Sequence, residues 1–172
     1  ISTSSPSKKS FTKCWTNSAK VGASRSNLYL SWGYGDLAPS TGARAIVGYM
    51  TDSGSGNLAV GHRRWILNPT TRVMATGSTS TANALTVTGT KTSKKAARPT
   101  YLEWPAKGWF PTQLEPDGRW SLSASSKKVS FAKAKVKVQR ITSKGKVLKK
   151  QKVRVHRVQD GYTHEPGAYW VP

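Results

Sequence analysis

The chain of 172 residues contains one cysteine, three histidines and seven acidic residues. The single Cys14 excludes an intrachain disulfide, and one cysteine with three scattered histidines argues against a zinc cluster. No apolar run approaches the roughly 18 residues of a membrane-spanning helix, and no signal peptide is visible. Because Ile1 is not a natural initiator and opens a Ser/Thr-rich loop, we interpret the chain as beginning inside a longer precursor.

The scarcity of acidic residues leaves a strongly basic protein. The chain has 28 Lys and Arg against seven Asp and Glu, a formal net charge of +21. Such a charge makes the compact state repel itself unless it is spread over surfaces or neutralised by a partner. Nucleic acid, an anionic cell-wall polymer and an anionic membrane are candidate partners. The alternative is a solvated surface that has no partner.

Two helices are predicted on either side of the Gly/Ser-rich stretch at 52–57, which is a strong helix terminator. The first runs from Ala43 to about Asp52. Its expected buried face follows the i, i+3, i+4, i+7 spacing of a helix and comprises Ala43, Ile46, Val47 and Met50. The second helix is shorter, covers Val60–Leu67 and ends before Pro69.

After Arg72 the apolar pattern changes from helical spacing to alternation, which is typical of strands. Strands are predicted at Val73–Ser80, Ala84–Thr88, Arg119–Ser123, Ala132–Val138, Val153–Val158 and Tyr169–Val171. The Ser143–Lys146 turn signal predicts a hairpin, with Val153–Val158 as its return strand. The segment Tyr101–Pro111 contains two prolines, so it cannot be a central strand and is expected to be irregular and packed.

Aromatic residues are concentrated in and after that irregular segment. They are Tyr101, Trp104, Trp109, Phe110 and Trp120. We interpret them as core, because Trp contributes a large apolar area. A carbohydrate-stacking surface is the alternative.

Three features of the first 80 residues occur together: Ser26-Asn27-Leu28, the helix predicted from Ala43, and the segment GHRRWILNP at 61–69. In these the chain resembles the second half of a CAP domain (also called the SCP-like or cysteine-rich secretory protein family), in its bacterial extracellular branch. The resemblance implies an α+β fold over residues 1–115, a helix–sheet–helix sandwich without its first helix. Residues 116–172 are then a basic β-rich extension packed on it.

The resemblance also implies a secreted bacterial binding or interaction module, at the cell envelope or in the extracellular space. In the family, two His and two acidic residues line a cleft that can hold a divalent metal. Here Ser26 stands where an acidic residue often precedes the Asn-Leu pair, and Thr3-Ser4-Ser5 stands where the first His is expected. Only His62 and Asp52 are left, which is too few for a tight site, so we expect no metal and no cofactor.

The expected ligand-binding cleft comprises His62, Arg63, Arg64, Asp52, Ser26 and Asn27. His62 is either a cleft-lining side chain that is hydrogen-bonded to the backbone or, with an acidic partner such as Asp52, part of a hydrolase acting on peptide or wall polymer. The two arginines either hold a carboxylate or phosphate or pack their stems on Trp65. If Asp52 instead pairs with one of the two arginines, these residues have a structural role.

A second candidate surface lies in the basic extension. Lys133, Lys135 and Lys137 alternate with apolar residues and are expected on one face of a strand. The predicted polyanion-binding set is Lys133, Lys135, Lys137, Lys146, Lys149, Lys150, Lys152 and Arg154. The excess of Lys over Arg and the lack of interleaved aromatics disfavour sequence-specific nucleic-acid binding. The expected partner is an anionic cell-wall polymer or another polyanion. Lipid and a host surface are further possible partners. The alternative interpretation is an exposed strand edge that Lys keeps soluble.

Overall fold

A computed structural model describes residues 15–31, 40–93, 101–116, 118–124, 129–158 and 167–171. The expectations for Cys14 and for Thr3–Ser5 lie outside these residues. The described chain mixes helices with small sheets, so its fold class is α+β. It divides into two compact units, Ile1–Met50 with Asn68–Ala97 and Thr51–Leu67 with Arg98–Pro172. The boundary expected at 115/116 lies within the second unit.

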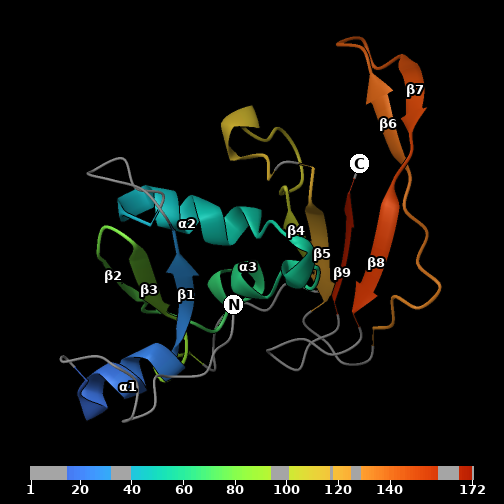
Figure 1. The fold of residues 1–172 in the computed structure, drawn as a ribbon. Coiled ribbons are helices and arrows are strands. Elements are labelled where there is room, and N and C mark those ends of the chain that lie inside the picture. Colours follow the sequence, from blue (N-terminus) through green and yellow to red (C-terminus); the bar gives the residue numbers. More distant parts are fainter. Residues whose placement is uncertain are drawn as a thin grey trace. The chain divides into compact units, whose positions relative to one another are not determined.

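The first unit is built around a three-stranded antiparallel sheet in the order β1-β3-β2 (Figure 1). Its strands are β1 Ser26–Leu30, β2 Ala75–Ser78 and β3 Ala82–Thr86. In β3, Asn83 and Leu85 are buried and their neighbours are not, which is the alternation of a strand with one covered face. The strands predicted at Val73–Ser80 and Ala84–Thr88 are confirmed as β2 and β3, although β2 is shorter than predicted and β3 begins two residues earlier.

Two helices complete this unit, α1 Asn17–Ser24 and α2 Gly42–Thr51, the last residue of which belongs to the second unit. The side chain of Thr16 caps α1 by accepting a hydrogen bond from the Ala19 amide at 3.0 Å.

The predicted helix at α2 is confirmed, but its predicted buried face is wrong. Its buried residues are Ala45 and Tyr49, whereas Ala43 is exposed and Val47 is 50% exposed. The Tyr49 hydroxyl lies 2.9 Å from the Asn27 carbonyl oxygen and 2.8 Å from Asn83 Oδ1. This polar anchor turns the face that carries Tyr49 inward, because a buried hydroxyl must find a partner.

The second unit holds a four-stranded antiparallel sheet in the order β4-β5-β9-β8. Its strands are β4 Tyr101–Trp104, β5 Trp120–Ala124, β8 Arg154–Val158 and β9 Gly167–Val171. The strands predicted near the positions of β5, β8 and β9 are confirmed. The segment Tyr101–Pro111 is not central, as predicted, but it begins with an edge strand rather than being irregular throughout.

Among the described residues, three short helical segments precede this sheet or lie between its strands. The 3₁₀ turn η2 Ser55–Asn57 leads to the helix α3 Gly61–Ile66, close to the predicted Val60–Leu67. A second 3₁₀ turn, η3 Thr112–Leu114, lies between β4 and β5. A small apolar cluster centres on Ala124 and Phe131, against which Leu122, Val129 and Ala134 pack.

The strand predicted at Ala132–Val138 is wrong. The chain turns after Phe131, where the Ala134 amide donates to the Phe131 carbonyl at 2.9 Å, and strand structure begins only at β6 Val138–Ile141. The guanidinium of Arg157 donates to the carbonyls of Phe131 and Ala134. These carbonyls are therefore satisfied by a side chain and not by a neighbouring strand.

The predicted turn at Ser143–Lys146 is confirmed, but the prediction of Val153–Val158 as its return strand is wrong, because that segment pairs with β9 as β8. The turn joins β6 to β7 Val147–Gln151 in a two-stranded antiparallel sheet, which Figure 1 shows as the orange hairpin. In the part of the chain that the structure describes, no helix has both the length and the apolar character to cross a bilayer.

Candidate functional site

Asp52 and His62, the two candidate catalytic residues, are in direct contact. Asp52 Oδ1 lies 2.8 Å from His62 Nδ1, and Asp52 Oδ2 accepts a hydrogen bond from the Arg63 amide at 3.3 Å. The Asp52 side chain is fully buried, whereas 19% of the His62 side chain is exposed. The carboxylate therefore orients the imidazole and also satisfies an amide in the first turn of α3, where a negative charge is favourable.

The loop that joins the two residues has an unusual backbone. Asp52 has a φ of 52° and Val60, the residue before α3, has a φ of 46°. Asp tolerates this left-handed region, but a β-branched residue rarely adopts it. Val60 is only 2% exposed, so its packing offsets the backbone cost.

Arg119, the residue before β5, holds this loop in place. Its guanidinium donates to the carbonyls of Asp52, Gly54 and Asn57. The sequence does not signal this role, because Arg119 lies 67 residues after Asp52 and its neighbours predict only a strand.

Arg63 is fully buried and holds α3 against β5. Its guanidinium donates to the Arg119 carbonyl at 2.8 Å, to Ser121 Oγ at 2.9 Å and to the Thr51 carbonyl at 3.1 Å. Burial lowers the pKa of Arg63 to about 10, while the nearby Asp52 carboxylate opposes that shift. Arg63 is thus not a solvated side chain, because its buried guanidinium donates to protein carbonyls and to the Ser121 hydroxyl.

The other residues predicted to line the cleft are Arg64, Ser26 and Asn27. Arg64 is 7% exposed. Ser26 and Asn27 belong to β1 in the first unit. Ser26 Oγ donates to the Gly22 carbonyl at 2.7 Å and lies 3.1 Å from Thr86 Oγ1, and the Asn27 carbonyl accepts from Tyr49.

Among the described residues, no group of three or more His, Cys, Asp and Glu side chains is arranged to hold a metal ion. Asp52 and His62 supply two potential ligands, and Nδ1 of that histidine already faces the carboxylate. What the pair offers chemically is an imidazole oriented by a buried carboxylate, the arrangement that serves general acid–base chemistry in hydrolases.

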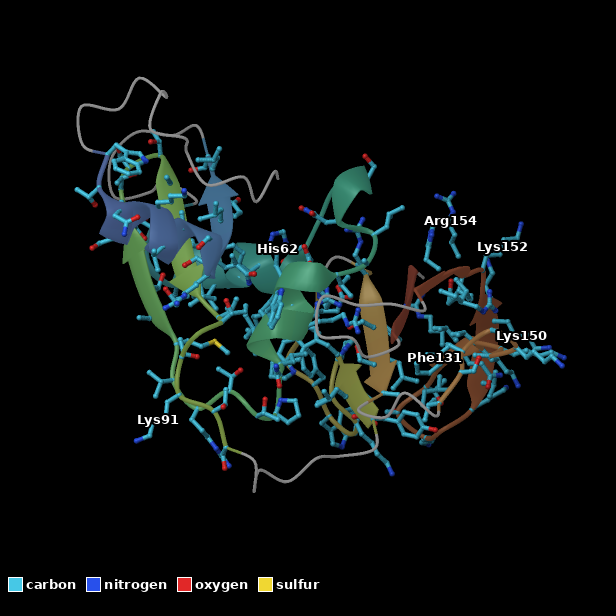
Figure 2. The ribbon with its side chains drawn as sticks, turned by 90° about the horizontal axis from the view of Figure 1, so that it is seen from below. His62, Lys91, Phe131, Lys150, Lys152 and Arg154 are labelled. Carbon is cyan, nitrogen blue, oxygen red and sulfur yellow. The ribbon has the colours of Figure 1, made fainter. Side chains whose placement is uncertain are left out.

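The predicted polyanion-binding residues are all exposed: Lys133, Lys135, Lys137, Lys146, Lys149, Lys150, Lys152 and Arg154. Figure 2 shows Lys150, Lys152 and Arg154 projecting outward. They do not share one sheet face, because Lys149 and Lys150 are consecutive in β7 and point to opposite sides. The pairing of β6 and β7 adds an exposed residue that sequence reasoning missed, Arg140, which lies directly opposite Lys149.

Comparison with known proteins gave no match to a family model, to a curated protein or to a solved structure.

Proposed function

We propose that this chain binds extended polyanions through the exposed basic residues around the β6–β7 hairpin. The observation that carries the proposal is the absence of any Asp or Glu between Asp117 and Asp160, together with the exposure of all eight lysines and arginines named above. The positive charge of this region therefore has no acidic counterpart within its own segment.

The strand pairing within the β6–β7 hairpin also supports polyanion binding. Arg140 lies directly opposite Lys149, and like charges at such a position destabilise a sheet. A bound polyanion would remove that repulsion and release its counterions, so binding and hairpin stability reinforce each other. Because the charges lie on both faces and on the preceding segment, they suit a flexible polymer better than a rigid duplex.

The resemblance to the CAP family gives this proposal its setting. We place the chain in a secreted or cell-wall-associated bacterial protein of CAP-like fold, with an anionic wall polymer as the partner. The helix α2 lies near the helix on which the resemblance rests, which is compatible with this setting.

The test compares three triple variants that lose equal charge. Lys133→Gln/Lys135→Gln/Lys137→Gln and Lys146→Gln/Lys149→Gln/Lys150→Gln remove charge from the proposed surface. The matched control, Lys20→Gln/Arg72→Gln/Lys91→Gln, removes it from exposed positions of the first unit, of which Lys91 is labelled in Figure 2. Binding to teichoic acid, heparin and single-stranded DNA is measured between about 50 and about 200 mM salt.

We expect both hairpin-region variants to bind all three polymers more weakly and to reduce the slope of log affinity against log salt by about 2 to 3. The control should change both quantities little. If the control weakens binding as much as the other variants, net charge alone drives the interaction and the hairpin surface is not the site.

A second candidate function is hydrolysis of a peptide or wall polymer at His62. The specific observation in its favour is the 2.8 Å contact that orients the imidazole, combined with the partial exposure of His62. The test is release of soluble fragments from casein and from peptidoglycan, with His62→Gln and a control at another histidine, His156→Gln. Release that His62→Gln abolishes and His156→Gln leaves intact supports hydrolysis, whereas no release by the wild type rejects it for these substrates.

A further inference from the structure

A pocket in the second unit differs in character from the basic hairpin. It has a volume of about 490 Å³, within the usual range for small-ligand sites. Most of its lining surface is apolar, and the lining includes the polar and aromatic side chains of Glu103, Lys107, Phe110, Thr112, Glu115 and Trp120. All of these residues come from the segment between β4 and β5 or from the ends of those strands.

Two aromatic walls of this pocket are held in place by neighbours. The Phe110 ring packs edge-on against Trp104, with ring centroids 5.0 Å apart at 84°. The Trp120 Nε1–H donates to Glu115 Oε1 at 2.6 Å, and the same oxygen accepts from the Gly118 amide at 2.8 Å. The aromatic surfaces are thus fixed before any ligand arrives, which lowers the entropic cost of binding.

Trp109 is adjacent in sequence to two residues that line this pocket, and its side chain is in solvent. It lies between the lining residues Gly108 and Phe110 and is 103% exposed, so the interpretation of this tryptophan as core is wrong. A fully exposed indole on the segment that lines an aromatic pocket offers a flat apolar face to a ligand.

The polar groups of the lining narrow the ligand class. The side chains of Glu103 and Lys107 make no hydrogen bond or ion pair with any residue that the structure describes, so an acceptor and a donor are available. The lining has two carboxylates and one ammonium, so it does not favour a polyanion, although the whole chain has a net charge of +21. The lining thus combines hydrogen-bond donors, acceptors and aromatic faces. A polyhydroxylated ring fits this combination, because its hydroxyls bind donors and acceptors and its C–H face stacks on an aromatic ring.

We propose that this pocket and Trp109 form a binding site for an uncharged saccharide. The site is separate from the polyanion surface, since it includes none of the eight basic residues assigned there. Its affinity should therefore be insensitive to salt, in contrast to binding at the hairpin.

The test uses the whole chain with two neutral probes, cellotetraose and the N-acetylglucosamine tetramer, and with choline as a cationic probe. Binding is followed by calorimetry and by tryptophan fluorescence at low and high salt. Trp109→Ala removes a side chain that lies in solvent, so the fold should survive, and Glu103→Gln keeps the size of the acceptor. Leu148→Ala, at a residue 56% exposed on β7, is the control for loss of exposed apolar surface.

We expect at least one tetrasaccharide to bind equally well at both salt concentrations, with about tenfold weaker binding for Trp109→Ala and for Glu103→Gln. Leu148→Ala should bind as the wild type does. The proposal is overturned if neither saccharide binds, if only choline binds, or if both pocket variants keep the wild-type affinity. The Lys133→Gln/Lys135→Gln/Lys137→Gln variant should bind saccharide normally, so failure of one proposal is distinguishable from failure of the other.

Discussion

The Asp52 carboxylate contacts two groups of α3 at once: one oxygen lies 2.8 Å from His62 Nδ1 and the other accepts the Arg63 amide at 3.3 Å. This buried carboxylate therefore serves as a helix cap and as the partner of the imidazole. Its own backbone is left-handed, with a φ of 52°, so the residue type at this position matters for three separate reasons.

We expect Asp52→Ala to lower the free energy of unfolding by about 2–4 kcal/mol, because it removes a helix cap and a buried hydrogen-bond acceptor. Asp52→Asn should lose about 1 kcal/mol less, since Asn tolerates the left-handed region and can still accept one hydrogen bond. Urea denaturation followed by tryptophan fluorescence measures both losses. Equal losses for the two variants would show that neither the conformational preference nor the remaining acceptor matters.

Burial of Tyr49, and then its neighbour Tyr29, raises the pKa of the Tyr49 phenol above its ordinary value of about 10. The folded state thus holds this proton more tightly than the unfolded state. The resulting stability is fully present below pH of about 10 and is lost as the pH rises through the folded-state pKa.

The comparison that isolates this effect is wild type against Tyr49→Phe. At neutral pH, Tyr49→Phe should be less stable by about 1–3 kcal/mol, because buried acceptors lose their donor. Urea unfolding at a series of alkaline pH values should show this difference shrinking as the pH rises above about 10. A difference that stays constant contradicts the assigned shift.

Gly48 packs directly under an aromatic ring. A Cβ at this position would lie 2.6 Å from Cε2 of Tyr29, whose ring is itself packed edge-on to Tyr49 at 87°. Gly48→Ala should therefore destabilise the protein by about 1 kcal/mol, because overpacking outweighs the gain in helix propensity. Gly22→Ala in α1 meets nothing within 4 Å and should stabilise it by up to about 1 kcal/mol. Thermal melts of the two variants must shift in opposite directions for this packing to be correct.

Val60 combines a buried side chain with a φ of 46°. Val60→Ala and Val60→Gly both remove most of the packing, but only glycine relieves the backbone strain. We expect the glycine variant to be more stable than the alanine variant by about 1 kcal/mol, as urea denaturation would measure. The reverse order would mean that the residue has an ordinary backbone conformation in solution.

The sequence predicts local elements better than the contacts between distant residues. Periodicity locates α2, yet its buried face depends on Tyr49 reaching Asn27 and Asn83, residues that no spacing within the helix reveals. Alternation at Ala132–Val138 suggests a strand, but Arg157 satisfies the carbonyls that a neighbouring strand would have bound. Both errors arise because distant partners override local pattern.

In the candidate site, too, local features are predictable from the sequence and distant contacts are not. Asp52 and His62, which lie ten residues apart, are the two site residues that the family resemblance retains, and they are in contact. Arg119 and Ser121 lie more than fifty residues away from the loop and the arginine that they contact, so no local signal could identify them. Trp109 was assigned to the core on composition alone, because a sequence cannot show which of several neighbouring aromatics faces solvent.

Among the described strands, β6 and β7 pair only with each other, so each has a long edge without a strand partner. The hairpin also exposes the apolar side chains of Ile141, Val147 and Leu148. Exposed strand edges tend to associate unless charge keeps copies apart, and the exposed lysines of the hairpin supply such charge. If the proposed polyanion binding occurs, the polymer neutralises that charge along its length and brings many copies close together. Saturating one polymer should therefore cause the protein to condense on it edge to edge, and an excess of polymer should disperse the copies again.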